Sequence, residues 1–244
     1  MEIHKPHAAK TWREFTVELA TITAGILIAL TLEQVIEWQH ASHRAREARE
    51  NIRVEIADNL GFMDVRQGIE QCISARLDEV LQMLQDSASG KPLPDPIWIG
   101  HPTDFSMRDS QFRSASQSGQ TSLLPTAEQA SYASIYASFA AYQEAQAIEQ
   151  KAWADLRTIE QRPVVSPIVD WQLRSAIQQA RSARWQMEIS RSLAMQASNA
   201  VSVLPAKYSP FTKFSACLPL KTSRAEALKF VVEGRPSRQS YDEP

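Results

Sequence analysis

A single apolar segment near the N-terminus, Phe15 to Ile36, limits what this chain can fold into more than any other feature. Its uncharged part, from Leu19 to Leu32, would cover only about 21 Å as an α-helix. The whole segment would cover about 33 Å, enough for a hydrocarbon core of about 30 Å, but it includes Glu18 and Glu33. Both glutamates would lie near the two membrane interfaces, where a carboxylate costs far less than at the midplane. The segment is therefore long enough to span a membrane.

Two features around the segment favour a span. Trp12 and Trp38 flank it, as interfacial aromatic residues flank membrane helices. The run continues into Leu-Glu-Gln-Val-Ile-Glu-Trp rather than into a small-x-small cleavage site, which argues against a secretory signal peptide. The alternatives to a span are the core helix of a soluble bundle and a cleaved or interfacial segment.

Basic residues on both sides of the segment bear on its orientation. Lys5, Lys10 and Arg13 precede it, and arginines follow it at positions 44, 46, 49 and 53, so the counts favour neither side. A short basic N-terminus before a first span usually stays in the cytoplasm. We therefore predict a short basic cytoplasmic segment at 1–14, a transmembrane helix at 15–37 and an exported domain beyond it.

One side of the apolar segment carries small and polar residues. At about 100° per residue, a stripe formed by Glu14, Glu18, Thr21, Gly25 and Ala29 falls within about 80° of arc. Small residues four positions apart let two helix backbones approach closely in lipid. The stripe therefore predicts helix–helix packing, with a second copy or with another membrane protein. The plain alternative is ordinary membrane-helix composition.

The composition of the rest predicts one all-α domain. Only seven of the 244 residues are glycine, which argues against a turn-rich β protein, and helix-forming residues are abundant. Positive and negative side chains nearly balance, at 26 and 28, so no basic excess indicates nucleic acid as a partner.

Apolar spacing and breaker residues predict the order of the helices. The first helix should continue beyond the membrane as an amphipathic stalk to about residue 65, and a second should run to about 85. After a proline-rich loop at 87–102 we expect helices at 106–117, 126–160, 166–204 and 224–233, with an irregular segment after 205 and a polar tail at 234–244. Thr126, with Gln129, should cap the fourth helix, and Ser166-Pro167 should open the fifth. The fifth helix has seven residues available for packing, namely Trp171, Leu173, Ile177, Ala180, Met187, Leu193 and Val201. The stalk and bundle domain is placed at 38–233.

The N-terminal part resembles a group of bacterial single-pass inner-membrane proteins to which no activity is assigned. The likeness rests on Arg13-Glu14, on the Gly-Ile-Leu-Ile-Ala-Leu run from Gly25 to Leu30, and on a charged helix ending at Glu55 to Asn59. A weaker echo is the stretch FRSASQSGQTSLLP before a tyrosine-rich helix. Glu18 departs from the more apolar span of that group. The resemblance implies a single-pass anchor with a helical domain.

No residue pattern specifies a reaction, a metal or a cofactor. Glycine-rich phosphate loops, Gly-x-Ser-x-Gly and His-Glu-x-x-His are all absent. His40 and His43 lie near Glu33, Glu37 and Glu47 on one helical side, a spacing that suits a divalent metal but suits an exposed polar stripe better. We predict no catalytic, cofactor-binding or metal-ligating residue.

The two cysteines, Cys72 and Cys217, have no metal-ligand spacing. In a reducing cytosol they would be small buried apolar residues, and in an oxidising periplasm they would be able to pair. A disulfide between them would attach the irregular C-terminal segment to the second helix.

Three functions of different classes remain. The first is a membrane-anchored interaction or scaffold protein of the cell envelope, with the lipid bilayer and a protein as partners. The second is a periplasmic ligand-sensing module that signals through a partner, since the cytoplasmic side holds only 1–14. The third is an enzyme or envelope-stress factor with unrecognised chemistry. An apolar surface patch would favour the first, and a deep pocket the others.

Overall fold

The structure is a computed structural model that describes residues 11–161, 165–208 and 215–231. It confirms the all-α fold class: the described part of the chain holds helices and no strand. The elements are α1 (Trp12–Gln67), α2 (Glu70–Ala88), α3 (Ser110–Gln117), η1 (Gln120–Leu123), α4 (Thr126–Leu156), η2 (Arg157–Gln161), α5 (Pro167–Ala200), η3 (Ser215–Cys217) and α6 (Arg224–Val231). The polar tail predicted at 234–244 lies outside the described residues.

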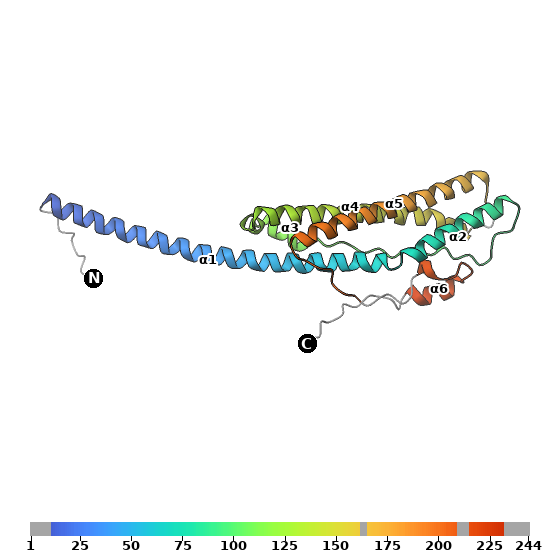
Figure 1. The fold of residues 1–244 in the computed structure, drawn as a ribbon, viewed down its shortest axis with the longest axis horizontal. Coiled ribbons are helices and arrows are strands. Elements are labelled where there is room, and N and C mark those ends of the chain that lie inside the picture. The colour runs from blue at the N-terminus through green and yellow to red at the C-terminus, as the bar shows by residue number, and fades with distance from the viewer. Residues whose placement is uncertain (1–10, 162–164, 209–214, 232–244) are drawn as a thin grey trace, which may run out of the picture.

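The first helix, α1, is continuous for 56 residues, and its N-terminal part, up to residue 40, forms a long arm (Figure 1). Thr11 begins it with a capping box, because its hydroxyl accepts from the Glu14 N–H while the Glu14 carboxylate accepts from the Thr11 N–H. Every residue from 11 to 40 is exposed, and Ala45 is the first buried one. The N-terminal half of α1 therefore stands free of the bundle, and only the C-terminal half packs.

Two glycines settle where the rod of α1 and α2 bends. Gly68 ends α1, and α2 starts at Glu70 with a visible change of direction (Figure 1). Gly61 lies inside α1 without breaking it. A Cβ there would lie 2.3 Å from the carbonyl oxygen of Ala206, whose N–H donates to Ala57 O at 2.8 Å. Gly61 is thus the place where the returning chain crosses α1.

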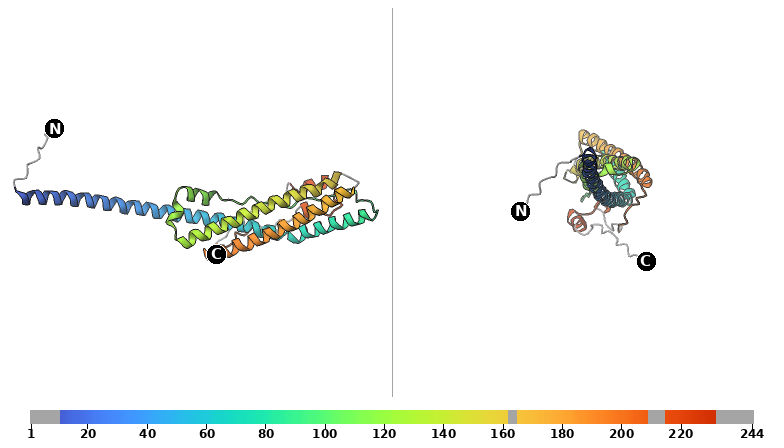
Figure 2. Two further views of the ribbon diagram at one scale, coloured as in Figure 1. Left: turned by 90° about the horizontal axis from the view of Figure 1, so that it is seen from above. Right: turned by 90° about the vertical axis from the view of Figure 1, so that its left-hand side faces the viewer.

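The bundle consists of the α4–α5 hairpin laid along the C-terminal half of α1 and along α2 (Figures 1 and 2). Its apolar residues form two clusters, one at each end. The cluster nearer the arm joins α1, α3, the first part of α4 and the last part of α5, with Ile52, Ile56, Leu60, Tyr132, Ile135, Phe139 and Met187 among its members. The other joins α2, the end of α4 and the start of α5, with Ile73, Leu77, Leu84, Trp153, Leu156 and Ile177.

The start of α5 follows a local rule, whereas the start of α4 does not follow the predicted one. Ser166 caps α5 through its hydroxyl and Pro167 is the first helical residue, as predicted. The capping box predicted at Thr126 is wrong. Pro125 is extended and its carbonyl accepts from the N–H groups of Glu128 and Gln129, so α4 begins at Thr126 itself. Gln129 instead donates to the carbonyl of Leu124 at 2.8 Å. Helix α5 ends at Ala200, short of the predicted 204.

Candidate functional site

The apolar segment predicted to span a membrane lies entirely in the exposed arm of α1. The arm contains an 18-residue window with a mean hydropathy of 1.9, and none of that window is buried inside the structure. Among the described residues, α1 is the one helix that is long and apolar enough to cross a membrane. Because the segment touches no other part of the bundle, it does not serve as a core helix of this domain.

The stripe of Glu14, Glu18, Thr21, Gly25 and Ala29 faces away from the bundle. Counted at about 100° per residue, Gly25 lies about 160° around α1 from Ala45, the first residue that contacts the bundle core. A Cβ built on Gly25 would meet nothing within 4 Å. The Thr21 hydroxyl donates to Val17 O in its own helix at 2.8 Å. The stripe is therefore open to a second helix at Gly25.

Cys72 of α2 and Cys217 of η3 are joined as a disulfide, with their Cα atoms 5.4 Å apart. Two further contacts hold the same C-terminal segment on the bundle. Arg76 donates to the Leu218 carbonyl, and the Trp98 N–H donates to Leu220 O at 2.7 Å. The disulfide therefore ties a segment 145 residues away in sequence to the helix that it lies against.

An extended segment between α2 and α3 runs back along the bundle, and buried side chains replace the strand partner it lacks. Gln146 donates to Phe105 O at 2.9 Å and accepts from its N–H at 3.1 Å. Asn59 makes the same paired contact with Arg108, at 2.7 and 2.9 Å. Glu160 accepts from the N–H groups of Ile99 and Gly100. These amides and carboxylates satisfy backbone groups that burial would otherwise leave without partners.

Glu55 of α1 completes the arrangement at the start of α3. Its carboxylate accepts from the Ser110 hydroxyl and from the N–H groups of Gln111 and Phe112, so a side chain of α1 caps α3. The Tyr136 hydroxyl donates to the same carboxylate at 2.6 Å. Burial, reinforced by this hydrogen bond, raises the pKa of Tyr136 above its ordinary value.

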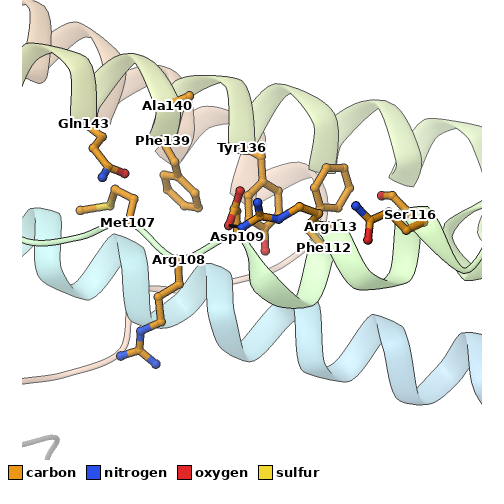
Figure 3. A pocket seen from close by; sticks show the side chains of 11 residues that line it. Met107, Arg108, Asp109, Phe112, Arg113, Ser116, Tyr136, Phe139, Ala140 and Gln143 are labelled. Carbon is orange, nitrogen blue, oxygen red and sulfur yellow. Dashed lines mark hydrogen bonds and ion pairs between the residues drawn. The ribbon is translucent and has the colours of Figure 1, made fainter.

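A groove lies between α3 and α4, and Tyr136 is one of the residues that line it (Figure 3). Its volume is about 590 Å³. Phe112, Tyr136 and Phe139 supply aromatic walls, with Phe112 stacked on Tyr136 at 4.4 Å between ring centroids. Arg108 and Arg113 at the rim are paired with Asp58 and Asp109, at 3.7 and 2.5 Å. The groove is chiefly apolar, and its rim charges are largely compensated.

A second cavity, of about 430 Å³, opens beside the junction of α1 and α2. Four arginines line it, at positions 66, 181, 184 and 191. Each is paired: Arg66 with Glu149 and Glu70, Arg184 with Glu70, Arg191 with Asp64 and Arg181 with Asp78. Because carboxylates match the guanidinium groups, this cavity carries no excess positive charge for an anion.

The exposed surface of α5 divides into a charged side and an uncharged side. All six charged residues of the helix lie within about 100° of arc: Asp170, Arg174, Arg181, Arg184, Glu188 and Arg191. On the other exposed side no residue is charged, and this uncharged face carries Ile168, Trp171, Trp185, Ile189 and Leu193 among serines, glutamines and alanines. Trp171 is 70% exposed and Trp185 is 67% exposed.

Two of the seven residues that the sequence offered for packing, Trp171 and Leu193, are therefore exposed, and the other five are buried. Leu173, Ala176, Ile177 and Ala180 occupy the buried side of α5 instead, because that side faces α4. A signal for the uncharged face existed in the sequence, since the charged residues of 167–200 already cluster on one side of a helical projection.

Neither metal-ligating side chains nor known relatives point to a further site in the described part of the chain. The described residues contain no group of three or more His, Cys, Asp or Glu able to hold a metal ion, and His40 and His43 lie exposed on the arm. No protein-family model, curated protein or solved structure matches this chain.

Proposed function

We propose that this chain is a single-pass, membrane-anchored interaction protein of the bacterial envelope, in which the arm of α1 spans the bilayer and the bundle presents the uncharged face of α5 to a protein partner. The observation that carries the interaction role is that face. A helix in water normally distributes charge over its exposed surface. Large aromatic residues on an uncharged face are typical of the buried centre of an interface.

The anchor is supported by the exposure of the apolar window. If those side chains met water, each would lose the free energy that burial provides, about 1.5–3 kcal/mol for a large aliphatic side chain. The arm has ten such residues that are exposed, among them Ile22, Ile26, Leu27, Ile28 and Leu30, each at least 51% exposed. A bilayer removes this cost without any protein partner.

The disulfide supports export of the bundle. Disulfides persist in the periplasm and are rare in a reducing cytosol. A periplasmic bundle agrees with the short basic segment that precedes the span, and with the inner-membrane proteins that the N-terminus resembles.

Site-specific photocrosslinking of the full chain in membranes tests the interaction role. A photoreactive residue at Ser182, inside the uncharged face, should give an adduct of defined mass, whether with another protein or with a second copy. The same residue at Gln85, exposed on α2, should not. Trp185→Asp should abolish the Ser182 adduct, because it places a charge where the partner excludes water. Equal adducts at both positions, or an adduct unaffected by Trp185→Asp, would refute this role for α5.

The groove between α3 and α4 supports ligand sensing as a second candidate. Aromatic walls around about 590 Å³ suit a small apolar molecule. Native mass spectrometry of the purified chain should then show a co-purified small molecule. Ala140→Trp, which fills the groove, should lose it, whereas Ala154→Trp, exposed farther along α4, should retain it.

A further inference from the structure

One loop at the end of the bundle nearest the arm carries no charge, although Arg49 and Glu128 form an ion pair beside it. From Ser114 to Ala127 the chain has no acidic, basic or histidine residue, and this stretch covers the end of α3, η1 and the start of α4. We call it the tip. Gly119, with φ of 73°, turns the chain into η1, and Leu124 is buried in the cluster that includes Ala45 and Ala48 of α1. Leu123, the neighbour of Leu124, is 51% exposed.

The tip lies beside α1 close to the end of its apolar segment (Figures 1 and 2). The first residues of α1 that lose exposure are Ala41 and Ser42. From Ile36 to Ala41 the helix rises only about 7.5 Å. The headgroup layer on each side of a bilayer is about 5–8 Å thick. If the apolar segment spans, the tip is therefore at the height of the lipid headgroups.

We infer that the tip is a second membrane contact, in which η1 enters the headgroup layer and Leu123 reaches toward the acyl chains. The inference rests on the proposed membrane anchor. An uncharged loop loses little on leaving water for the interface, whereas a charged loop would have to keep its side chains hydrated. The tip contacts the same bilayer that holds α1, because no more than one and a half helical turns separate the tip from the end of the apolar segment.

A second contact would restrict the tilt of the bundle relative to the membrane. A single helix crossing a bilayer is able to tilt and rotate, and its packing partners and interfacial anchors set its orientation. With the tip seated beside α1, the bundle is held at two points. Its other end, where α2 finishes, then points away from the membrane (Figure 1).

Fluorescence quenching in vesicles tests the contact. The full chain, with Leu123→Cys labelled by a nitrobenzoxadiazole maleimide, is reconstituted in phosphatidylethanolamine and phosphatidylglycerol. Because Cys72 and Cys217 are paired in the absence of reductant, only the introduced thiol reacts. Lipids with a nitroxide high on the acyl chain should remove most of the emission at position 123. Ser122→Cys serves as a second probe of the tip, and Lys91→Cys, at the far end of the bundle, should lose none.

The possible results separate the two proposals. If the probes at 122 and 123 keep their emission while the protein resists carbonate extraction, the tip does not touch lipid and the anchor stands. If the probes are blue-shifted yet unquenched, a protein covers the tip, and the inference is overturned. Release of the protein by carbonate overturns the anchor and, with it, the membrane contact.

Discussion

Arg66 donates to both carboxylate oxygens of Glu149, at 2.7 and 2.9 Å, and both side chains are buried between the two apolar clusters of the bundle. Glu70 accepts from the same guanidinium at 2.7 Å. Burial raises the pKa of Glu149, and the attraction of Arg66 opposes this effect. The charged pair thus joins the end of α1 to the C-terminal part of α4, where the two clusters meet.

Removing one member of this pair should be costly. Glu149→Ala leaves the Arg66 guanidinium buried with only Glu70, and we expect a loss of about 3–5 kcal/mol in the free energy of unfolding. Arg174→Ala, which breaks a surface pair with Asp170, should cost less than about 1 kcal/mol. Urea unfolding of the full chain in detergent measures both. Similar losses for the two variants would show that the buried pair has no special role.

The tyrosines of α4 predict a loss of stability at high pH. Burial raises the pKa of Tyr132, Tyr136 and Tyr142 above the ordinary value of 10.0. The folded state therefore keeps these protons when the unfolded state releases them. The contribution of these tyrosines to the free energy of unfolding is fully present below pH 10. Above pH 10 it should fall by about 1.4 kcal/mol per pH unit for each tyrosine. Tyr136→Phe should make this fall shallower in unfolding curves recorded on both sides of pH 10, whereas an unchanged slope would contradict the assignment.

The disulfide should protect the C-terminal segment. In the chain-entropy model, a link across 145 residues contributes up to about 5 kcal/mol, provided both ends unfold together with the bundle. We expect the Cys72→Ser, Cys217→Ser double variant to be less stable than the native chain. Protease cleavage after Lys221 should become faster, because only the packing of Ala216 and Leu220 and hydrogen bonds such as Trp98 to Leu220 would then hold the segment. Equal cleavage of the two proteins would contradict a protective role.

Helix pairing through the arm depends on Gly25. A leucine at this position clashes with nothing in its own chain, since a Cβ there has no neighbour within 4 Å. Gly25→Leu should therefore preserve insertion and abolish crosslinked dimers, because it would hold two backbones apart. Leu27→Ala, on the side of α1 opposite Gly25, should leave dimers unchanged. Dimer yields that are equal in the native chain and in Gly25→Leu would mean that the stripe is ordinary membrane composition.

The helices were predictable because their signals are local. The uninterrupted pattern after Glu33 predicted one long helix, Ser166 and Pro167 predicted the start of α5, and prolines predicted the loop after α2. Two predictions failed, for different reasons. Thr126 has cap chemistry, but the extended Pro125 carbonyl already binds the first amides of α4. Trp171 is a large apolar residue of the kind that packs in cores, but it lies on the exposed side of α5.

The sequence by itself determined the all-α class, the order of the helices and the apolar segment, since periodicity, capping and hydropathy depend only on neighbours along the chain. Only the tertiary structure decided which residues meet. It brings Glu55 to the start of α3, pairs Arg66 with Glu149, and leaves one face of α5 uncovered. These relationships depend on how the α4–α5 hairpin lies against α1. That choice depends on packing between segments many residues apart, which no local pattern contains.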